Sequence, residues 1–143
     1  MNSPVCIDTS VLIKLVVEEA GSDLVDRLWE SWIVSSIQII APSLLRYEVA
    51  AVLKKKEHRG QLSAVLARSA LSAVLNLEEI EFVDSADLHL HAWELAGRLD
   101  LPTLFDAYCL ALAEMRNCAL WTADRRLYRS VKAKVPYVRF TAA

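Results

Sequence analysis

The sequence predicts an α/β fold in which a parallel sheet is covered by helices on both faces. Short apolar segments typical of buried strands alternate along the chain with longer segments of helical periodicity. The strand segments are continuously apolar rather than alternately apolar and polar, as expected where both faces of a sheet are covered. In such folds the crossovers between strands are right-handed, and ligands bind beyond the carboxyl ends of the strands.

The predicted elements follow one another along the whole chain. The strand segments are "PVCID" (4–8), "IQIIAP" (37–42), "IEFVD" (80–84), "CALWTAD" (118–124) and, as an expected last strand, "YVRFT" (137–141). Apolar residues at helical spacing predict helices over residues 9–22, 22–34, 43–60, 61–77, 86–101, 103–117 and 125–131. Gly21 and Gly60 stand at the ends of two of these helical segments, where glycine is favoured.

The composition is that of one globular domain over residues 1–143. Hydrophobic residues make up 55% of the chain and charged residues 24%, which is ample for a core, and only 3 glycines and 4 prolines argue against a long linker. We see no leader segment and no apolar run long enough to cross a bilayer, so we expect a cytoplasmic protein without a membrane partner. The 3 cysteines form no CxxC pair and are interpreted as small hydrophobic residues.

Charge is distributed unevenly, although the net charge is only −2. From Arg116 to the end of the chain, basic residues recur and Asp124 is the only acid, and a second basic cluster spans residues 54–59. Such clusters are commonly no more than solvated faces. They can also steer a polyanion toward a site. The candidates for this guidance are Arg125, Arg126, Lys54 and Lys55.

Four acidic side chains stand near the junctions of strands and helices. They are Asp8, Glu48, Asp106 and Asp124. Asp8 and Asp124 each follow a predicted buried strand, and an ordinary helix cap explains either one. Glu48 fits an exposed helical position, and Asp106 lies three residues after Thr103, at the spacing of a capping box. Each acid alone therefore has a structural explanation.

The parallel sheet would bring these four carboxylates together, because strand C-termini and helix N-termini gather at the same edge of such a sheet. Carboxylates that share a cleft repel one another, and a divalent cation supplies the missing counter-charge. Oxygen ligands without Cys or His nearby favour Mg²⁺ or Mn²⁺, and the matching chemistry is hydrolysis of a phosphodiester. Ser10 and Thr122 stand two residues from Asp8 and Asp124, so we expect their hydroxyls to orient a carboxylate or a bound water.

These residues are similar to those of the PIN domain family, and most of all to its VapC-type toxin ribonucleases. The matching segments, in order, are "VCIDTSVLIKL", "APSLLRYEVAAVL", "LPTLFDAYCLALAE" and "LWTADRRL", and the similarity spans nearly the whole chain. The resemblance implies a three-layer α/β/α sandwich with a central parallel sheet of four or five strands. It also implies a metal-dependent endoribonuclease that acts as the toxin of a type II toxin–antitoxin pair, forms a homodimer and is held inactive by a cognate antitoxin.

The resemblance also implies roles for individual residues. Asp8, Asp106 and Asp124 would be the principal ligands of one or two Mg²⁺ or Mn²⁺ ions, and Glu48 would either bind metal or position the attacking water. Ser10 and Thr122 match the small polar positions of the family. The sequence departs from many relatives at Ala51, three residues after Glu48, where they carry a small polar residue, often Asn.

Two alternatives remain open at this point. The chain could be a PIN-like nuclease of RNA processing rather than a toxin, or a non-catalytic α/β module that binds a partner. Metal binding at the acidic cleft separates the second alternative from an enzyme. The preference for RNA over DNA rests on the resemblance alone, because the carboxylates would serve either substrate.

Overall fold

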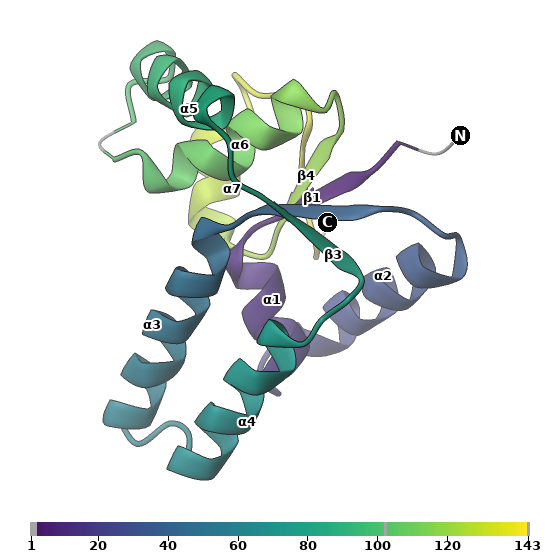
Figure 1. Ribbon diagram of the computed structural model, residues 1–143, viewed down its shortest axis with the longest axis vertical. Coiled ribbons are helices and arrows are strands. Elements are labelled where there is room, and N and C mark those ends of the chain that lie inside the picture. Colours follow the sequence, from purple (N-terminus) through teal and green to yellow (C-terminus); the bar gives the residue numbers. More distant parts are fainter. Residues whose placement is uncertain (1–2, 102, 143) are drawn as a thin grey trace.

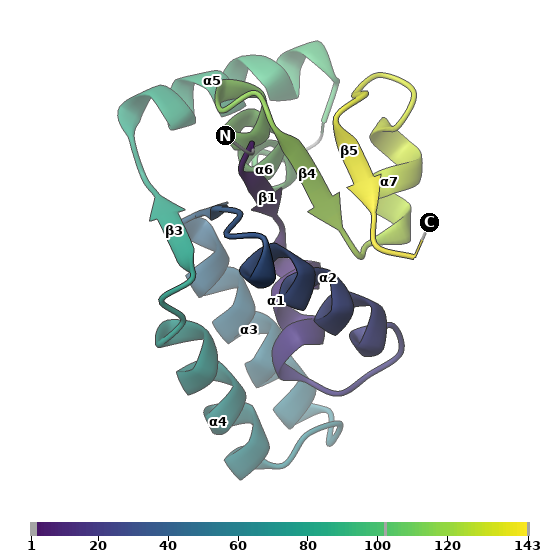
Figure 2. The ribbon, with the colours of Figure 1, turned by 90° about the vertical axis from the view of Figure 1, so that its right-hand side faces the viewer.

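A computed structural model describes residues 3–101 and 103–142 and contains a sheet of five parallel strands (Figures 1 and 2). The strands are β1 (Val5–Ile7), β2 (Ile39–Pro42), β3 (Ile80–Val83), β4 (Ala119–Thr122) and β5 (Val138–Phe140). They lie in the order β3-β2-β1-β4-β5, so β3 and β5 form the two edges, as Figure 2 shows. The predicted parallel sheet is confirmed, including its expected last strand.

Helices cover both faces of this sheet. They are α1 (Thr9–Val16), α2 (Ser22–Val34), α3 (Leu44–His58), α4 (Ala64–Leu75), α5 (Ala86–Arg98), α6 (Phe105–Met115) and α7 (Arg125–Val131). In Figure 1, α1 to α4 lie below the sheet and α5 to α7 lie above it. Helix α6 packs on the central strands, and α5 packs on α6. The three-layer α/β/α sandwich implied by the resemblance is therefore confirmed.

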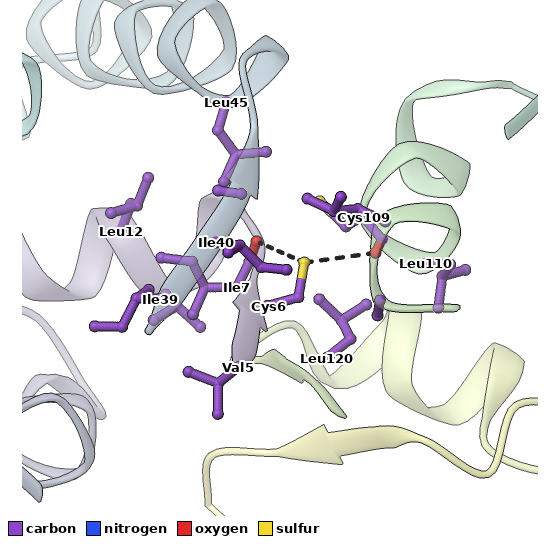
Figure 3. Close-up of a cluster of buried hydrophobic side chains, with 14 of the residues drawn as sticks. Val5, Cys6, Ile7, Leu12, Ile39, Ile40, Leu45, Cys109, Leu110 and Leu120 are labelled. Carbon is purple, nitrogen blue, oxygen red and sulfur yellow. Dashed lines mark hydrogen bonds between the residues drawn. The ribbon is translucent and has the colours of Figure 1, made fainter. Parts of the chain in front are cut away.

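The core lies where β1 and β2 meet α1 and α6 (Figure 3). Every residue of β1 and β2 is buried, as expected for strands covered on both faces. Cys6 extends from β1 toward α6, where its thiol lies 3.6 Å from the carbonyl oxygen of Cys109 (Figure 3). Cys6, Cys109 and Cys118 are free and buried, in agreement with their interpretation as small hydrophobic residues.

The order in which the chain adds strands to the sheet changes sides at β1, between β1 and β4. The connection after β1 leads to β2 on one side, whereas β4 pairs with β1 on the other side. Ile7 is in register with Trp121, so the next residues of the two strands, Asp8 and Thr122, emerge side by side at the carboxyl edge. Ligands of open α/β sheets bind at such a switch point.

Helices α3 and α4 form a hairpin that extends away from the sheet in Figure 1. Leu45, Val49 and Leu53 anchor α3 to the core, and Val74 does so for α4. The base of α3 therefore approaches the carboxyl edge of the sheet while its far end projects outward. Across residues 3–101 and 103–142, no helix has the length and apolar character needed to cross a membrane.

Candidate active site

A cavity of about 450 Å³ opens at the carboxyl edge of the sheet, beside the switch point. Its walls come from α1 and the loop after it, from one side of α3, and from the starts of α6 and α7, which lie far apart in the sequence. The four acids singled out from the sequence all line it: Asp8, Glu48, Asp106 and Asp124. We call this cavity the acidic pocket.

Asp8 lies at the base of the acidic pocket, where β1 ends and α1 begins. It is the N-cap of α1 and only 7% exposed. Its Oδ1 accepts hydrogen bonds from the Ser10 hydroxyl at 2.5 Å and from the Val11 N–H at 3.3 Å, and its Oδ2 accepts one from the Thr122 hydroxyl. These donors fix the direction of both oxygens but carry no charge. The same carboxylate thus caps α1 and lines the acidic pocket.

Ser10 and Thr122 connect Asp8 to the segment that carries Asp124. The Ser10 hydroxyl oxygen accepts a hydrogen bond from the Ala123 N–H at 2.8 Å, and the Thr122 hydroxyl oxygen accepts one from the Asp124 N–H at 3.0 Å. Each hydroxyl therefore accepts from the loop after β4 while it donates to Asp8. The expectation that these hydroxyls orient a carboxylate agrees with this geometry.

Asp124 and Asp106 enter the pocket from helix starts of different kinds. Asp124 is the N-cap of α7, and its Oδ1 accepts from the N–H groups of Arg126 and Leu127 at 3.0 and 3.2 Å. Asp106 lies in the first turn of α6, whose N-cap is Leu104 and has no capping side chain. A capping box with Asp106 would require Thr103 to be the N-cap, but α6 begins at Phe105 and its N-cap is Leu104. The capping-box explanation of Asp106 is therefore wrong.

Glu48 reaches the pocket from the second turn of α3. Its Oε1 accepts a hydrogen bond from the Thr9 hydroxyl at 2.9 Å, which joins α3 to the start of α1. Glu48 is half-buried rather than part of a freely solvated face. Ala51, one turn further along α3, is exposed and carries no group that could share this hydrogen bond.

Burial and the charge of a neighbouring acid disfavour the ionised forms of Asp8, Glu48 and Asp106. Burial raises the pKa of Asp8 to about 6, against the lowering effect of its hydrogen bonds, and the charge of Asp124 adds to the rise. The pKa of Glu48 is raised by burial and by Asp106, and the pKa of Asp106 by burial and by Asp124. The carboxylates therefore form one electrostatic unit whose negative charge is only partly offset, as by Arg126 beside Asp106.

The donor set of this unit fits a hard divalent cation. All of its ligating atoms are carboxylate or hydroxyl oxygens, which are the donors that Mg²⁺ and Mn²⁺ prefer. A bound cation would also remove the repulsion that raises the pKa values. Over residues 3–101 and 103–142, no three Asp, Glu, His or Cys side chains are already close enough to enclose a metal ion. The carboxylates would therefore have to draw together on binding.

The acidic pocket also contains three charged residues that the sequence did not single out as site residues: Lys14, Glu19 and Lys56. Lys14 and Lys56 both contact Glu19, with Nζ to carboxylate oxygen distances of 3.2 and 3.1 Å. Burial opposes the ionisation of Glu19, but the hydrogen bonds and charges of the two lysines outweigh it and lower its pKa. Lys14 also donates to the carbonyl oxygen of Ala20 at 2.7 Å. The two lysines are thus held at the wall of the pocket.

The four basic residues proposed to guide a polyanion do not gather at one place. Arg126 lines a second groove that borders Asp106 and Asp124, and the Arg125 guanidinium lies 5.3 Å from the centre of the Phe140 ring. Lys54 pairs with Glu57 at 3.2 Å on the outer part of α3, and Lys55 is exposed beside it. From this cluster it is Lys56 that reaches the acidic pocket.

Comparisons with known proteins agree with this architecture. The family model described as "PIN domain" matches residues 5–133, which is most of the chain. The chain belongs to the PIN domain family. Within this family it is similar to a VapC ribonuclease of Mycobacterium bovis and to ribonuclease VapC9 of Mycobacterium tuberculosis. Each is 32% identical over 104 residues, which cover 73% of this chain and 79% of the relative.

Solved structures of other proteins share the fold of this PIN domain. A Pyrobaculum aerophilum protein, PAE2754, superimposes with a TM-score of 0.71 over 99% of this chain and 93% of its own, at 21% identity. VapBC2 from Rickettsia felis, solved with a DNA fragment from its promoter, gives a TM-score of 0.66 over 95% and 96%, at 18% identity. At these identities the likeness concerns the fold.

Proposed function

We propose that this chain is a metal-dependent endoribonuclease that hydrolyses phosphodiester bonds of RNA, and that it is the toxin of a type II toxin–antitoxin pair. The observation that carries the proposal is the convergence of Asp8, Glu48, Asp106 and Asp124 on one pocket at the switch point of a PIN domain. Relatives that bear the name ribonuclease VapC support RNA as the substrate. The active unit in this proposal is a single domain over residues 1–143.

Asp8, Asp106 and Asp124 are the proposed principal ligands of Mg²⁺ or Mn²⁺, with Glu48 as a further ligand or as the group that positions the attacking water. A bound metal of this kind polarises the phosphodiester and lowers the pKa of the attacking water. The chain's own contribution is to hold Asp8 in one orientation through Ser10 and Thr122.

Glu48 is suited to accept a proton from the attacking water. Its pKa is raised, mainly by burial, which makes its carboxylate a stronger base than an exposed glutamate. The Thr9 hydroxyl restrains one of its oxygens. Among residues 3–101 and 103–142, no group donates a hydrogen bond to the other oxygen, Oε2, which is therefore available to accept a proton.

Two protein partners belong to the proposal. A cognate antitoxin is supported by the solved toxin–antitoxin complexes of this fold from Klebsiella pneumoniae and Rickettsia felis. A second copy of the chain is supported by an apolar patch on α5, where Leu90 and Trp93 are 64% and 70% exposed one turn apart. Size-exclusion chromatography with Trp93→Ala tests the second copy, because a dimer that uses this patch would dissociate.

Cleavage of a single-stranded RNA tests the proposed reaction. We expect cleavage with Mg²⁺ or Mn²⁺, none with EDTA, and a loss for Asp106→Asn that exceeds the roughly 10- to 100-fold typical of outer-shell changes at metal sites. Asp26→Asn is the matched control, because Asp26 is an exposed acid on α2, away from the pocket. Activity that survives both EDTA and Asp106→Asn would contradict the proposal.

The same assay separates the alternatives. Single-stranded DNA of the same sequence tests the preference for RNA. A chain that binds neither metal nor nucleic acid, yet binds a protein partner tightly, would be the non-catalytic module. Growth arrest on expression that Asp106→Asn relieves would support a toxin over an enzyme of RNA processing.

A further inference from the structure

A second cavity, of about 390 Å³, borders the acidic pocket. Asp106, Asp124 and the buried Leu127 line both cavities, so the two carboxylates lie at the boundary between them. On its other sides the second cavity is lined by Arg126, Lys134 and the apolar side chains of Leu101 and Val131. We call it the flanking groove.

The basic side chains of the flanking groove differ from those of the acidic pocket in their partners. Lys14 and Lys56 are both bound to Glu19. In the described part of the chain, by contrast, the side chains of Arg126 and Lys134 form no ion pair. Both are exposed, so their charges are available to a ligand from solvent.

The charge of Arg126 acts on the catalytic side of the boundary as well. Arg126 stands two residues after Asp124 and lines the flanking groove together with Asp106 and Asp124, which places its charge beside both boundary carboxylates. Asp100 adds one negative charge to the groove. Once a metal neutralises Asp106 and Asp124, the two positive charges of Arg126 and Lys134 outweigh the one negative charge of Asp100.

We propose that the flanking groove binds a phosphate of the RNA strand that adjoins the scissile phosphodiester, through Arg126 and Lys134. This inference rests on the proposed function. An RNA strand whose scissile phosphate lies at Asp106 and Asp124 continues into the cavity that borders these residues. Its next phosphate is negatively charged and is therefore attracted to the unpaired side chains of Arg126 and Lys134 in that cavity. The partly exposed apolar side chains of Leu99 and Leu101 provide a surface for the sugar and base of the same nucleotide.

Binding of RNA to charge-matched variants tests the groove. The probe is a short single-stranded RNA that the wild-type chain cleaves at one mapped bond. Binding is measured with Mg²⁺ present in a Glu48→Gln background, which prevents cleavage and leaves Asp8, Asp106 and Asp124 to hold the metal. The test variant is Arg126→Ala with Lys134→Ala. The control is Arg129→Ala with Lys132→Ala, which removes two positive charges from exposed positions of the same segment, outside the groove. Thermal melting checks that both variants are folded.

We expect the groove variant to bind RNA at least about ten-fold more weakly than the control, as for the loss of charge-assisted hydrogen bonds. The slope of log affinity against log salt concentration should also fall by about 0.7 for each phosphate that the variant no longer neutralises. A neutral methylphosphonate in place of the phosphate next to the scissile bond should weaken RNA binding by the protein that keeps Arg126 and Lys134. It should have little effect on RNA binding by the groove variant.

Equal losses in the two variants, or no loss in either, would overturn the groove assignment, since binding would then depend on overall charge or on other residues. A methylphosphonate effect that persists in the groove variant would do so as well. A wild-type chain that cleaves no RNA with metal contradicts the proposed function and the groove together. Cleavage by the wild type with unchanged binding by the groove variant contradicts the groove alone.

Discussion

Asp8 combines two demands that are usually met by different residues. It caps α1 through the Val11 N–H, and it lines the acidic pocket with its two oxygens held by Ser10 and Thr122. The hydrogen bonds favour its ionised form, whereas burial disfavours that form more strongly and raises its pKa to about 6. An ionised Asp8 is therefore costly until a cation arrives.

This cost predicts how stability depends on pH in the absence of metal. The pKa of Asp8 rises from 3.8 to about 6 on folding, so the folded state holds the proton more tightly than the unfolded chain. The contribution of Asp8 to the free energy of unfolding is present below about pH 4 and falls by about 3 kcal/mol as pH rises through 6. Urea denaturation in EDTA from pH 4 to 8 measures this change. Asp8→Asn should flatten the curve over that range, and parallel curves for the two proteins would contradict the assignment.

The hydroxyl of Thr122 allows a test of orientation alone. Thr122→Val keeps the shape of a fully buried side chain and removes the donor to Asp8 Oδ2. We expect a roughly 10- to 100-fold loss of metal affinity or of kcat, as for other residues that orient metal ligands. Thr103→Val removes an exposed hydroxyl as the control. An unchanged metal affinity and rate in Thr122→Val would show that the hydroxyl has no orienting role.

At the scale of elements, the site depends on the register of two adjacent strands. Ile7 pairs with Trp121, and the hydrogen bond from the Asp8 N–H to the Trp121 carbonyl oxygen, at 3.3 Å, extends this pairing to the first residue beyond β1. The apolar residues of β1 and β4 hold these strands in the core. The positions of Asp8 and Asp124 are thus a consequence of packing several residues away.

A core substitution in β4 tests this dependence. Leu120 is completely buried between β1 and β5, so Leu120→Ala should lower the free energy of unfolding by about 2–5 kcal/mol. Leu90→Ala, at a position 64% exposed, should change it by less than about 0.5 kcal/mol if the chain is monomeric under the conditions used. Chemical denaturation of both variants measures the difference. Similar values for the two would mean that β4 contributes little to the core.

The elements also show which parts of the site could be predicted from the sequence. Asp8 and Asp124 follow short apolar runs, so their place at the carboxyl edge depends on a local pattern that the sequence displays. The contacts of Thr9 with Glu48, and of Glu19 with Lys14 and Lys56, have no such pattern. The contacts of Thr9 with Glu48 and of Glu19 with Lys56 arise where α1 and the loop after it pack against α3, which neither sequence segment reveals alone.

At the scale of the whole molecule, the proposed metal site would couple folding to metal binding. Four carboxylates from distant segments meet only in the folded chain, so a metal that binds them binds the folded state and stabilises it. At pH 7.5, Mn²⁺ at about 100 times its dissociation constant should raise the free energy of unfolding by about 2.7 kcal/mol. Asp124→Asn should reduce this gain, and Asp26→Asn should not. An equal gain in both variants would indicate metal binding elsewhere.

The central claim is that Asp8, Glu48, Asp106 and Asp124 form a metal centre. A crystal structure of the protein soaked in Mn²⁺, with anomalous diffraction recorded to locate the ion, tests it most directly. The account predicts one or two Mn²⁺ ions in the acidic pocket, bound by oxygen atoms of Asp8, Asp106 and Asp124. An acidic pocket without anomalous density under conditions in which the protein cleaves RNA, or Mn²⁺ bound only at other residues, would contradict it.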